Sequence, residues 1–225
     1  MPATAVLRQP SRTLVITATA VPLALAVLVD DVRVRRQLHV ARRDPLSGLR
    51  GRADLLAYGD RLLRTGRGGR VYVMLLDGNG FKAVNDTYGH GAGDAVIATT
   101  GRRLAAWTTR RRALAARLGG DEFAVAAVLP DRSALADITA LREQLHQPLT
   151  HDGRTLQMTV SLGIARAADL PGEDTGRLLR AADTAMYKVK TGDAAFPYLA
   201  TRADAYAEAV NGRRAGRPGT HLPAA

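Results

Sequence analysis

The hydrophobic positions of this chain alternate between helical and strand spacing. Leucines recur on one helical face over 52–64, and the run VYVMLLD at 71–77 then reads as a buried strand. Helical spacing returns over 91–110. Two short apolar runs at 113–118 and 122–129 flank a glycine-rich turn, which is the pattern of a β-hairpin. The first half therefore predicts a helix, a strand, a helix and two paired strands.

The second half of the chain continues the alternation. A further helix carries four apolar residues on one face: Leu135, Ile138, Leu141 and Leu145. A turn at Asp152 and Gly153 precedes a strand over 155–165, and helices are expected over 175–190 and about 202–210. The order of strand, helix, two strands, helix and strand matches an α+β, ferredoxin-like fold. In that fold the first and third strands lie together at the centre of an antiparallel sheet.

An uncharged apolar segment occupies residues 14–29. Its 16 residues include Pro22, which makes it short against the ~20 residues that a spanning helix needs. Basic residues within 33–43 outnumber those before the segment, so the positive-inside rule favours the placement of everything downstream at the inner face of the cytoplasmic membrane. We therefore expect a membrane anchor over 1–30 and a basic linker helix over 31–43. A cleaved signal peptide is the competing interpretation, and a cytoplasmic protein follows if the segment does not span.

The composition of the chain limits the classes of partner and of metal site that it can have. The chain of 225 residues has a formal net charge of +11, which suits a polyanionic partner: nucleic acid, acidic lipid or a nucleoside triphosphate. The arginine clusters lack the interleaved aromatic residues that base stacking needs, so solvated faces and membrane-proximal charge are favoured over a nucleic-acid surface. The sequence has no cysteine, which excludes disulfides and thiolate metal sites and favours hard cations such as Mg²⁺.

Three acidic residues stand where the predicted sheet would bring them together. Asp77 ends the first strand, and Asp121 and Glu122 belong to the hairpin. Because the end of the first strand and the start of the third are neighbours in this topology, their carboxylates should converge. Clustered carboxylates hold Mg²⁺, which activates hydroxyls and polarises phosphates in phosphoryl transfer. The competing interpretation is that acids at strand ends are turn residues only.

The stretch after Asp77 has the features of a phosphate-binding turn. Gly78 and Gly80 permit close approach of a ligand, and the backbone amides that open the following short helix can cradle phosphate oxygens. Lys82 then offers a cation for the charge on a transferred phosphoryl group. Similar strand-to-helix turns occur without any ligand, so this turn alone is weak evidence.

A polar, glycine-rich stretch, NDTYGHGAGD, follows at 85–94 and reads as a loop. It contains Asn85, His90 and Asp94. A carboxylate can accept both N1–H and N2–H of guanine, which favours guanine over adenine. For His90 the alternative is a turn histidine bonded to backbone, and for Asp94 it is N-capping of a helix that follows Gly93.

Five sequence motifs occur in order between residues 44 and 192. The hairpin reads ARLGGDEFAV, with DPLSGLRGR and DGNGFKAVNDTYGHGAGD before it and VSLGIA and AADTAMYKVK after it. Through these motifs, residues 44–192 closely resemble the GGDEF family of diguanylate cyclases. The resemblance implies a sheet like that of nucleotide cyclases. It also implies the condensation of two GTP molecules into cyclic di-GMP with release of two pyrophosphates.

The resemblance also implies roles for individual residues. Mg²⁺ or Mn²⁺ would be held by Asp77, the backbone carbonyl of Gly78, Asp121 and Glu122. Catalysis would fall to Asp121, Glu122 and Lys82. The substrate would contact Phe81, Asn85, His90, Asp94 and Lys190. Since each active site of this family binds one GTP, two chains must face each other, which implies a homodimer.

Three positions depart from the family pattern. Asn79 stands where a second aspartate is usual, which removes one negative charge beside the metals. The spacing from Lys190 to the glycine that follows it is one residue shorter than usual, and Asp193 stands where an arginine commonly contacts phosphate. Ala113 replaces the aspartate of the product-inhibition motif that Arg110 would begin, so feedback through that site is not expected. The tail at 193–225 is expected to be partly disordered.

These departures keep three hypotheses open. The first is an active cyclase, supported by the intact signature. The second is a catalytically degenerate module that binds GTP or a cyclic dinucleotide and signals through protein contacts. The third is a basic nucleic-acid-binding protein, which is motivated by the net charge alone.

Overall fold

The computed structural model describes residues 43–65 and 68–207. All the described residues except Arg43 belong to one compact unit, which begins at Asp44. The apolar segment at 14–29 and the predicted linker helix lie outside the described residues, apart from Arg43. Among the residues that the structure describes, no helix is both long and apolar enough to cross a membrane.

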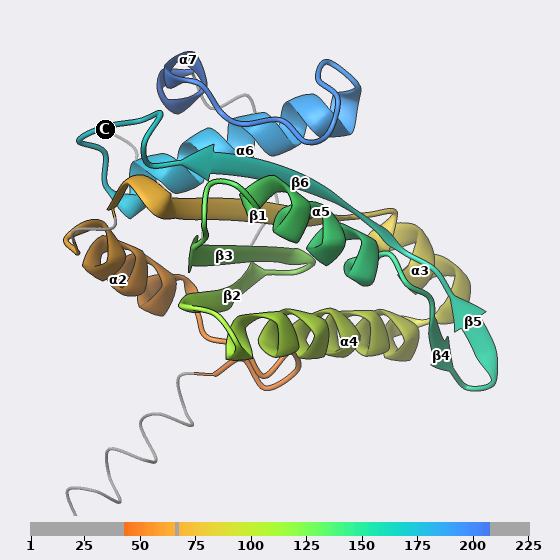
Figure 1. Ribbon diagram of the computed structural model, residues 1–225. Coiled ribbons are helices and arrows are strands. Elements are labelled where there is room, and N and C mark those ends of the chain that lie inside the picture. The colour runs from red at the N-terminus through yellow and green to blue at the C-terminus, as the bar shows by residue number, and fades with distance from the viewer. Residues whose placement is uncertain (1–42, 66–67, 208–225) are drawn as a thin grey trace, which may run out of the picture. The chain divides into compact units, whose positions relative to one another are not determined.

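A four-stranded antiparallel sheet forms the centre of the domain, with the strand order β2-β3-β1-β6 (Figure 1). Its strands are β1 (Val71–Asn79), β2 (Ala113–Gly119), β3 (Glu122–Val128) and β6 (Thr159–Arg166). The first and third strands of the sequence occupy the two central places. The predicted antiparallel α+β sheet is therefore confirmed.

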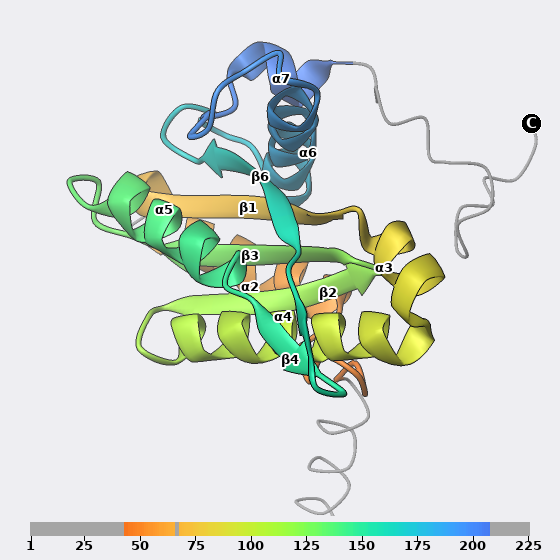
Figure 2. The ribbon, with the colours of Figure 1, turned by 90° about the vertical axis from the view of Figure 1, so that its right-hand side faces the viewer.

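Helices cover both faces of the sheet (Figures 1 and 2). They are α2 (Arg52–Leu63), α3 (Phe81–Tyr88), α4 (His90–Thr109), α5 (Ala134–Leu145), α6 (Thr175–Thr191) and α7 (Arg202–Tyr206), with a short 3-10 helix, η1 (Gly68–Arg70). Met74 and Leu76 of β1 share a core with α4 and α5, whereas Val73 and Leu75 share a second core with α2 and α6. Because successive residues of a strand point to opposite faces, β1 is buried on both sides, which explains its uninterrupted apolar run.

The strand expected over 155–165 is divided in the structure. Arg154–Leu156 forms β5, which pairs with β4 (Leu149–His151) in a separate hairpin before β6 begins. The turn between β4 and β5 needs left-handed backbone at Asp152 (φ 48°) and Gly153 (φ 72°), a conformation that Asp-Gly supplies readily. The chain therefore turns back on itself once before it joins the main sheet.

The stretch at 85–94 is not a loop, contrary to the prediction. Its residues complete α3 and begin α4, and only Gly89 (φ 83°) separates the two helices. Gly89 is therefore the N-cap of α4, and the N-capping role considered for Asp94 is wrong because Asp94 lies one turn inside the helix. The polar composition suggested a loop, but residues 86–91 are exposed to solvent in the structure, so this part of the helices needs no apolar face.

Segments outside the sheet bridge both of its outer strands. Arg50 forms a parallel bridge with Ala116 of β2, and Leu199 forms one with Ile164 of β6. Next to the second bridge, the amide of Ala200 donates to the carbonyl of Ile164 at 2.7 Å. Each outer strand therefore has a partner on its outward side at one point along its length.

Candidate active site

The acidic residues singled out in the sequence meet at one end of the two central strands. Asp77 of β1 lies directly opposite Glu122, the first residue of β3, in the antiparallel register. The amide of Gly78 donates to the carbonyl of Asp121 at 3.3 Å, so the hairpin turn is bonded to the next residue of β1. The structure thus brings these four backbone positions together as the predicted topology requires.

Gly78 allows the β1 backbone and the hairpin to approach closely. A Cβ atom at this position would stand 3.2 Å from the side chain of Asp121 and 3.1 Å from the sulfur of Met158. Both distances are tighter than ordinary contacts, so a larger residue would displace the Asp121 carboxylate. The Gly78 main chain and this carboxylate share a space that glycine leaves open, and both carry oxygen atoms suited to a hard cation.

The carboxylate of Asp77 is buried and pairs with a lysine. The residue is 9% exposed, and its Oδ2 accepts a hydrogen bond from the ammonium of Lys190 at the end of α6. A cation beside a buried carboxylate offsets its desolvation. The Lys190 ammonium thus lies beside Asp77, where a bound metal ion would also place positive charge.

The oxygen donors at this end of the sheet fit Mg²⁺ in type but are not assembled around one point. Across residues 43–65 and 68–207, no three Asp, Glu or His side chains gather into a ready-made metal cluster. Mg²⁺ commonly keeps several waters and binds through one or two carboxylates plus substrate phosphates. The carboxylates of Asp77 and Asp121, with the Gly78 carbonyl, would therefore supply as many protein ligands as such a site uses.

Asn79 is tied to β6 by its side chain. Its amide nitrogen donates to the hydroxyl of Thr159 at 3.1 Å, and its carbonyl oxygen accepts from the hydroxyl of Ser161 at 2.9 Å. An aspartate could accept from hydroxyls but could not donate to one. Asn79 therefore joins the end of β1 to β6 with a neutral side chain.

The turn after β1 opens α3 without a side-chain cap. Gly80 is left-handed (φ 75°), and it makes no side-chain hydrogen bond to the first amides of α3, which begins at Phe81. The side chain of Lys82 is 92% exposed, and its ammonium lies 3.5 Å from the carboxylate of Asp86. Such a surface pair contributes little stability, so Lys82 can exchange Asp86 for a phosphate at small cost.

Asn85 lies against the first turns of α4. A Cβ atom at Gly93 would stand 2.0 Å from Oδ1 of Asn85, so a glycine is needed where the two helices meet. His90 and Asp94 are both exposed and stand four residues apart in α4, which puts them on one helix face. The structure therefore brings Asn85 against the residue that precedes Asp94.

An ion pair that the sequence did not reveal fastens the hairpin to the start of the domain. Arg117 donates to both carboxylate oxygens of Asp44 at 2.9 and 3.0 Å and to the carbonyl of Gly120 at 2.9 Å. The amide of Ser47 also donates to Asp44 at 2.7 Å. Partial burial raises the pKa of Asp44, but the hydrogen bonds from Ser47 and Arg117 outweigh it and hold that pKa below its ordinary value. The only signal in the sequence was an arginine shortly before the double glycine.

We expect Asp44→Asn to destabilise the domain at neutral pH by about 1–3 kcal/mol, because Arg117 loses a charged bidentate acceptor. Since the folded-state pKa of Asp44 lies below its unfolded value, its carboxylate stabilises the fold above the unfolded pKa, and this contribution is lost as the pH falls through the folded pKa. Urea unfolding of the protein and the variant should therefore differ at pH 7, and the difference should shrink as the pH falls from ~4 through the lower folded-state pKa of Asp44. Asp54→Asn removes a partly buried pair with Arg50 that has a single contact at 3.7 Å in place of two short ones, and it should change stability less than Asp44→Asn at pH 7. A difference that persists unchanged in acid would contradict this account.

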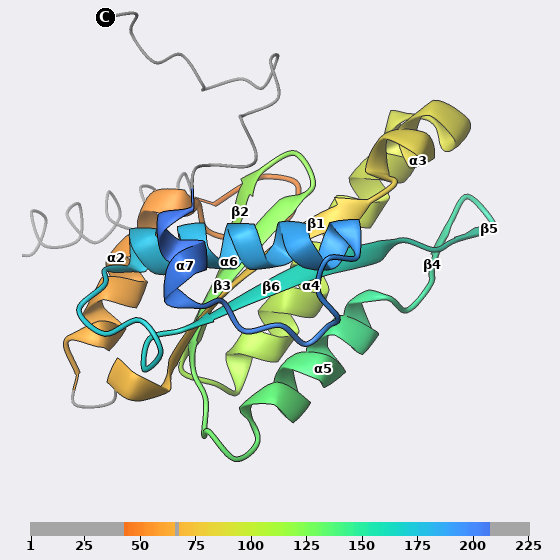
Figure 3. The ribbon, with the colours of Figure 1, turned by 90° about the horizontal axis from the view of Figure 1, so that it is seen from above.

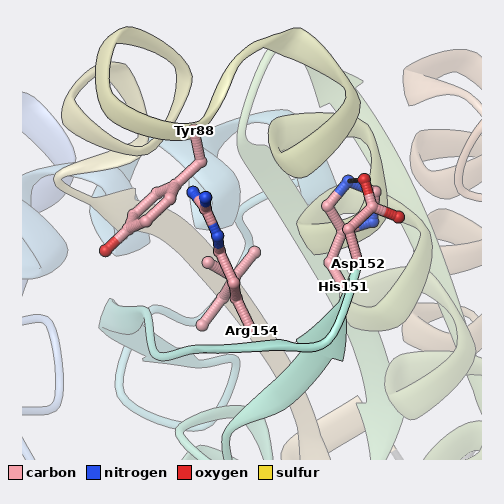
Figure 4. A pocket seen from close by; sticks show the side chains of 5 residues that line it. Tyr88, His151, Asp152 and Arg154 are labelled. Atoms are coloured by element: carbon pink, nitrogen blue, oxygen red, sulfur yellow. Dashed lines mark ion pairs between the residues drawn. The ribbon is translucent and has the colours of Figure 1, made fainter.

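A pocket of about 250 Å³ lies between α3 and the β4–β5 hairpin (Figure 4). Its lining residues are Tyr88, His151, Asp152, Arg154 and Leu156. The ring of His151 lies 3.6 Å from where a Cβ of Gly91 would stand, so the hairpin rests against the first turn of α4. The pocket was not predicted, because most of its lining comes from the hairpin that the sequence did not reveal.

Residues 41–194 match the family model described as diguanylate cyclase, GGDEF domain. The chain belongs to the GGDEF family. The matched region of this GGDEF domain contains every residue predicted for the site and ends before α7.

The relatives of this GGDEF domain include an uncharacterised protein and a named diguanylate cyclase. It is 44% identical over 173 residues to an uncharacterised 19.3 kDa protein of Streptomyces ambofaciens, and the match covers 77% of this chain and 91% of that protein. It is 34% identical over 170 residues to the diguanylate cyclase DgcZ of Escherichia coli, covering 75% of this chain but only 56% of DgcZ. The structure also resembles the coiled coil and GGDEF domain of DgcB from Caulobacter crescentus, solved in complex with c-di-GMP. The TM-score is 0.64 at 26% identity, covering 81% of this chain and 100% of that one.

The signature of this GGDEF domain spans the hairpin turn and the start of β3. Gly119 (φ 149°) and Gly120 (φ 53°) have positive φ angles, and a β-bulge precedes the turn. Asp121 and Glu122 follow at the site, and Phe123 is 2% exposed in the core. The glycines therefore shape the turn, the two acids follow it beside the end of β1, and the phenylalanine anchors β3.

Proposed function

We propose that this domain is a diguanylate cyclase that joins two GTP molecules into cyclic di-GMP and releases two pyrophosphates. The observation that carries the proposal is the pairing of β1 with β3, which sets Asp77 opposite Glu122 beside the intact signature turn. Membership of the GGDEF family supports the same reaction.

Mg²⁺ or Mn²⁺ would be held by oxygen atoms of Asp77, Gly78, Asp121 and Glu122. When bound, such an ion polarises phosphate oxygens and offsets the charge of the leaving pyrophosphate. Glu122 would also be in a position to accept the proton of the attacking 3′-hydroxyl, because it begins β3 beside the carboxylates of β1 and the turn. The main chain of the turn and of the α3 start would orient the phosphates.

Two lysines would bind the triphosphate. Lys82 would exchange its exposed contact with Asp86 for the transferred phosphoryl group, where its charge stabilises the transition state. The side chain of Lys190 is 32% exposed, so its ammonium is accessible to a phosphate while it remains beside Asp77. Together they would balance the negative charge that nucleotide and carboxylates bring into one site.

Selectivity for guanine would come from the junction of α3 and α4. Asp94 would accept N1–H and N2–H of the base, and Asn85, held against Gly93, would contact its edge. His90 lies one turn before Asp94 on the same helix face, and the half-buried ring of Phe81 would add apolar contact. Adenine lacks the donor pair that Asp94 requires and would be rejected.

Two copies of the domain would be needed for one product. Each site would hold one GTP, and the 3′-hydroxyl of each would attack the α-phosphorus of the other. Each new bond from 3′-oxygen to phosphorus replaces a bond to pyrophosphate, so two pyrophosphates leave per cyclic product. A homodimer with facing sites meets this requirement.

The direct test is turnover by the full chain. The purified protein is incubated with Mg²⁺ and GTP at concentrations that permit dimers, and cyclic di-GMP and pyrophosphate are measured beside an Asp121→Ala control. Two pyrophosphates should form per dinucleotide. Absence of dinucleotide above the control would reject the cyclase.

A degenerate GGDEF domain that binds GTP without turnover is the second candidate. Asn79 favours it, since this side chain brings no charge and is engaged with Thr159 and Ser161. Such a domain should bind a nucleotide in calorimetry and leave GTP intact. Rapid consumption of GTP would exclude it.

We expect Asn79→Asp to raise the apparent affinity for Mg²⁺ by about threefold to tenfold, because affinity for a hard cation grows with the number of charged ligands. The same change removes the donor to Thr159 and should destabilise the fold by about 0.5–1.5 kcal/mol. Mg²⁺ titrations of nucleotide binding measure the first effect and urea unfolding the second. Thr159→Val is the matched control, since it removes the hydrogen bond and adds no charge. Identical Mg²⁺ titrations for the protein and Asn79→Asp would show that this side chain does not face the metal.

A further inference from the structure

The structure continues past the region matched to the family, and this extension folds back onto α6 and β6. Residues 195–207 run along β6, where Leu199 bridges Ile164, and then form α7 across α6 (Figures 1 and 3). A capping box at Thr201 and Asp204 starts α7. The extension is therefore an ordered part of the domain with contacts to the helix that carries Lys190.

Asp204 is the centre of these contacts. It is 1% exposed and accepts hydrogen bonds from the amide of Thr201 at 2.7 Å, from the hydroxyls of Thr201 and Tyr198 at 2.9 Å, and from the ammonium of Lys188 at 2.6 Å. Burial raises the pKa of Asp204, but these bonds outweigh it and lower the pKa, so the group is a carboxylate at neutral pH. A buried carboxylate is costly to leave unpaired, so Asp204 holds Lys188 firmly.

Lys188 and Lys190 belong to the same last turn of α6. Two residues apart in a helix, they point to nearly opposite sides. Lys188 reaches Asp204 in the extension, and Lys190 reaches Asp77 at the end of β1. One turn of helix therefore connects the buried contact of the extension with the acidic end of the sheet.

This last turn has little anchorage in the core. The helix residues Ala181, Ala182, Ala185 and Met186 are buried, but between 187 and 191 no residue is fully buried. A helix end without buried apolar contacts opens readily. The bond from Lys188 to Asp204 is thus a main restraint on the backbone that carries Lys190, beside the bonds of Lys188 to the Tyr198 hydroxyl at 3.2 Å and to the Ala194 amide at 3.1 Å.

We propose that Asp204 is a positioning residue for Lys190: by holding Lys188, it fixes the last turn of α6 so that the Lys190 ammonium stands between Asp77 and the bound triphosphate. The proposal rests on the nucleotide site described under the proposed function. Asp204 itself touches neither nucleotide nor metal, and its effect passes through the helix.

The test is a double-mutant cycle on nucleotide affinity. Binding of a non-hydrolysable GTP analogue with Mg²⁺ is measured by calorimetry for the full chain, Asp204→Asn, Lys190→Met and the double variant. Asp204→Asn should weaken binding about tenfold in the otherwise unchanged protein and have almost no further effect beside Lys190→Met, because the two changes remove one interaction. Equal weakening in both backgrounds, or no weakening by Lys190→Met itself, would overturn the proposal.

Two further variants separate positioning from stability. Lys188→Met should reproduce the loss of affinity and Lys188→Arg should largely restore it, and this pair decides the matter if Asp204→Asn does not fold. Tyr206→Phe removes a bond from the same extension to Glu173, which precedes α6 at the opposite end of that helix from Lys188, and it should leave affinity unchanged even where it lowers the melting temperature. Loss of affinity in Tyr206→Phe equal to that in Lys188→Met would mean that the extension supports the domain in general, and it would contradict a specific role for Asp204.

The outcome is independent of turnover. Non-additive binding in a protein that forms no dinucleotide would reject the cyclase and keep the role of Asp204. Dinucleotide formation with additive binding losses would keep the cyclase and reject the role of Asp204.

Discussion

Asp77→Asn should lower the formation of cyclic di-GMP by at least about 10³-fold, because the site loses its buried carboxylate and would hold a divalent cation with only the acids of the hairpin turn. The variant should remain folded. Asn79 cannot substitute, since its side chain is neutral and bonded to β6. The change is isosteric, so the β1–β3 pairing and the packing around it are retained.

Dinucleotide is measured by chromatography under saturating Mg²⁺ and GTP, with thermal unfolding recorded in parallel. Asp169→Asn is a suitable control, because this aspartate pairs only loosely with Arg166, at 3.9 Å, on the surface. It should keep full activity. Retention of more than about a tenth of the activity by Asp77→Asn would remove Asp77 from the essential metal ligands, since loss of a principal electrostatic group costs far more.

Gly163→Ala should destabilise the domain by about 3 kcal/mol or more, because the added methyl group has no space. Its Cβ would stand 2.0 Å from the carbonyl oxygen of Ala182 and 2.2 Å from the amide of Met186. Both atoms belong to the backbone of α6, so the helix can make room only by moving away from β6. Urea unfolding gives the change in the free energy of unfolding directly.

The same substitution at a site with space provides the control. A Cβ at Gly69 would have only the methyl group of Ala168 at 4.0 Å within range, so Gly69→Ala should alter stability by no more than about 0.5 kcal/mol. Lys190 lies one turn beyond Met186, so the displaced helix of Gly163→Ala should also weaken nucleotide binding. An unfolding midpoint for Gly163→Ala close to that of the unsubstituted protein would mean that α6 does not pack against β6 as described.

The strands of the main sheet could be located in the sequence because each has its own run of apolar residues, and their order could be predicted because the succession of elements matches a ferredoxin-like fold. The division of 155–165 into two strands could not be predicted, because polar and apolar residues alternate along it without interruption. Whether Arg154–Leu156 continues into β6 or pairs with Leu149–His151 is decided by tertiary contacts, not by local preference. The helices hidden in 85–94 were missed for a related reason, since exposed helices need no apolar stripe.

The site was predictable where its residues lie in contiguous motifs and not where distant segments meet. The signature turn and the start of α3 are read directly from the chain. By contrast, Arg117 meets Asp44 across 73 positions and Lys190 meets Asp77 across 113. Such pairs depend on the complete fold, and residue types alone do not distinguish them from the many other charged residues.

Arg50 and Leu199 bridge the outward sides of β2 and β6. A strand from another chain could add to either edge only by displacing a bridge, so a continuous intermolecular sheet is disfavoured. Copies of the domain would then have to meet through surfaces other than the sheet edges. Under the proposed cyclase reaction, the yield of dinucleotide per molecule should then rise with protein concentration, because two copies must meet for each product.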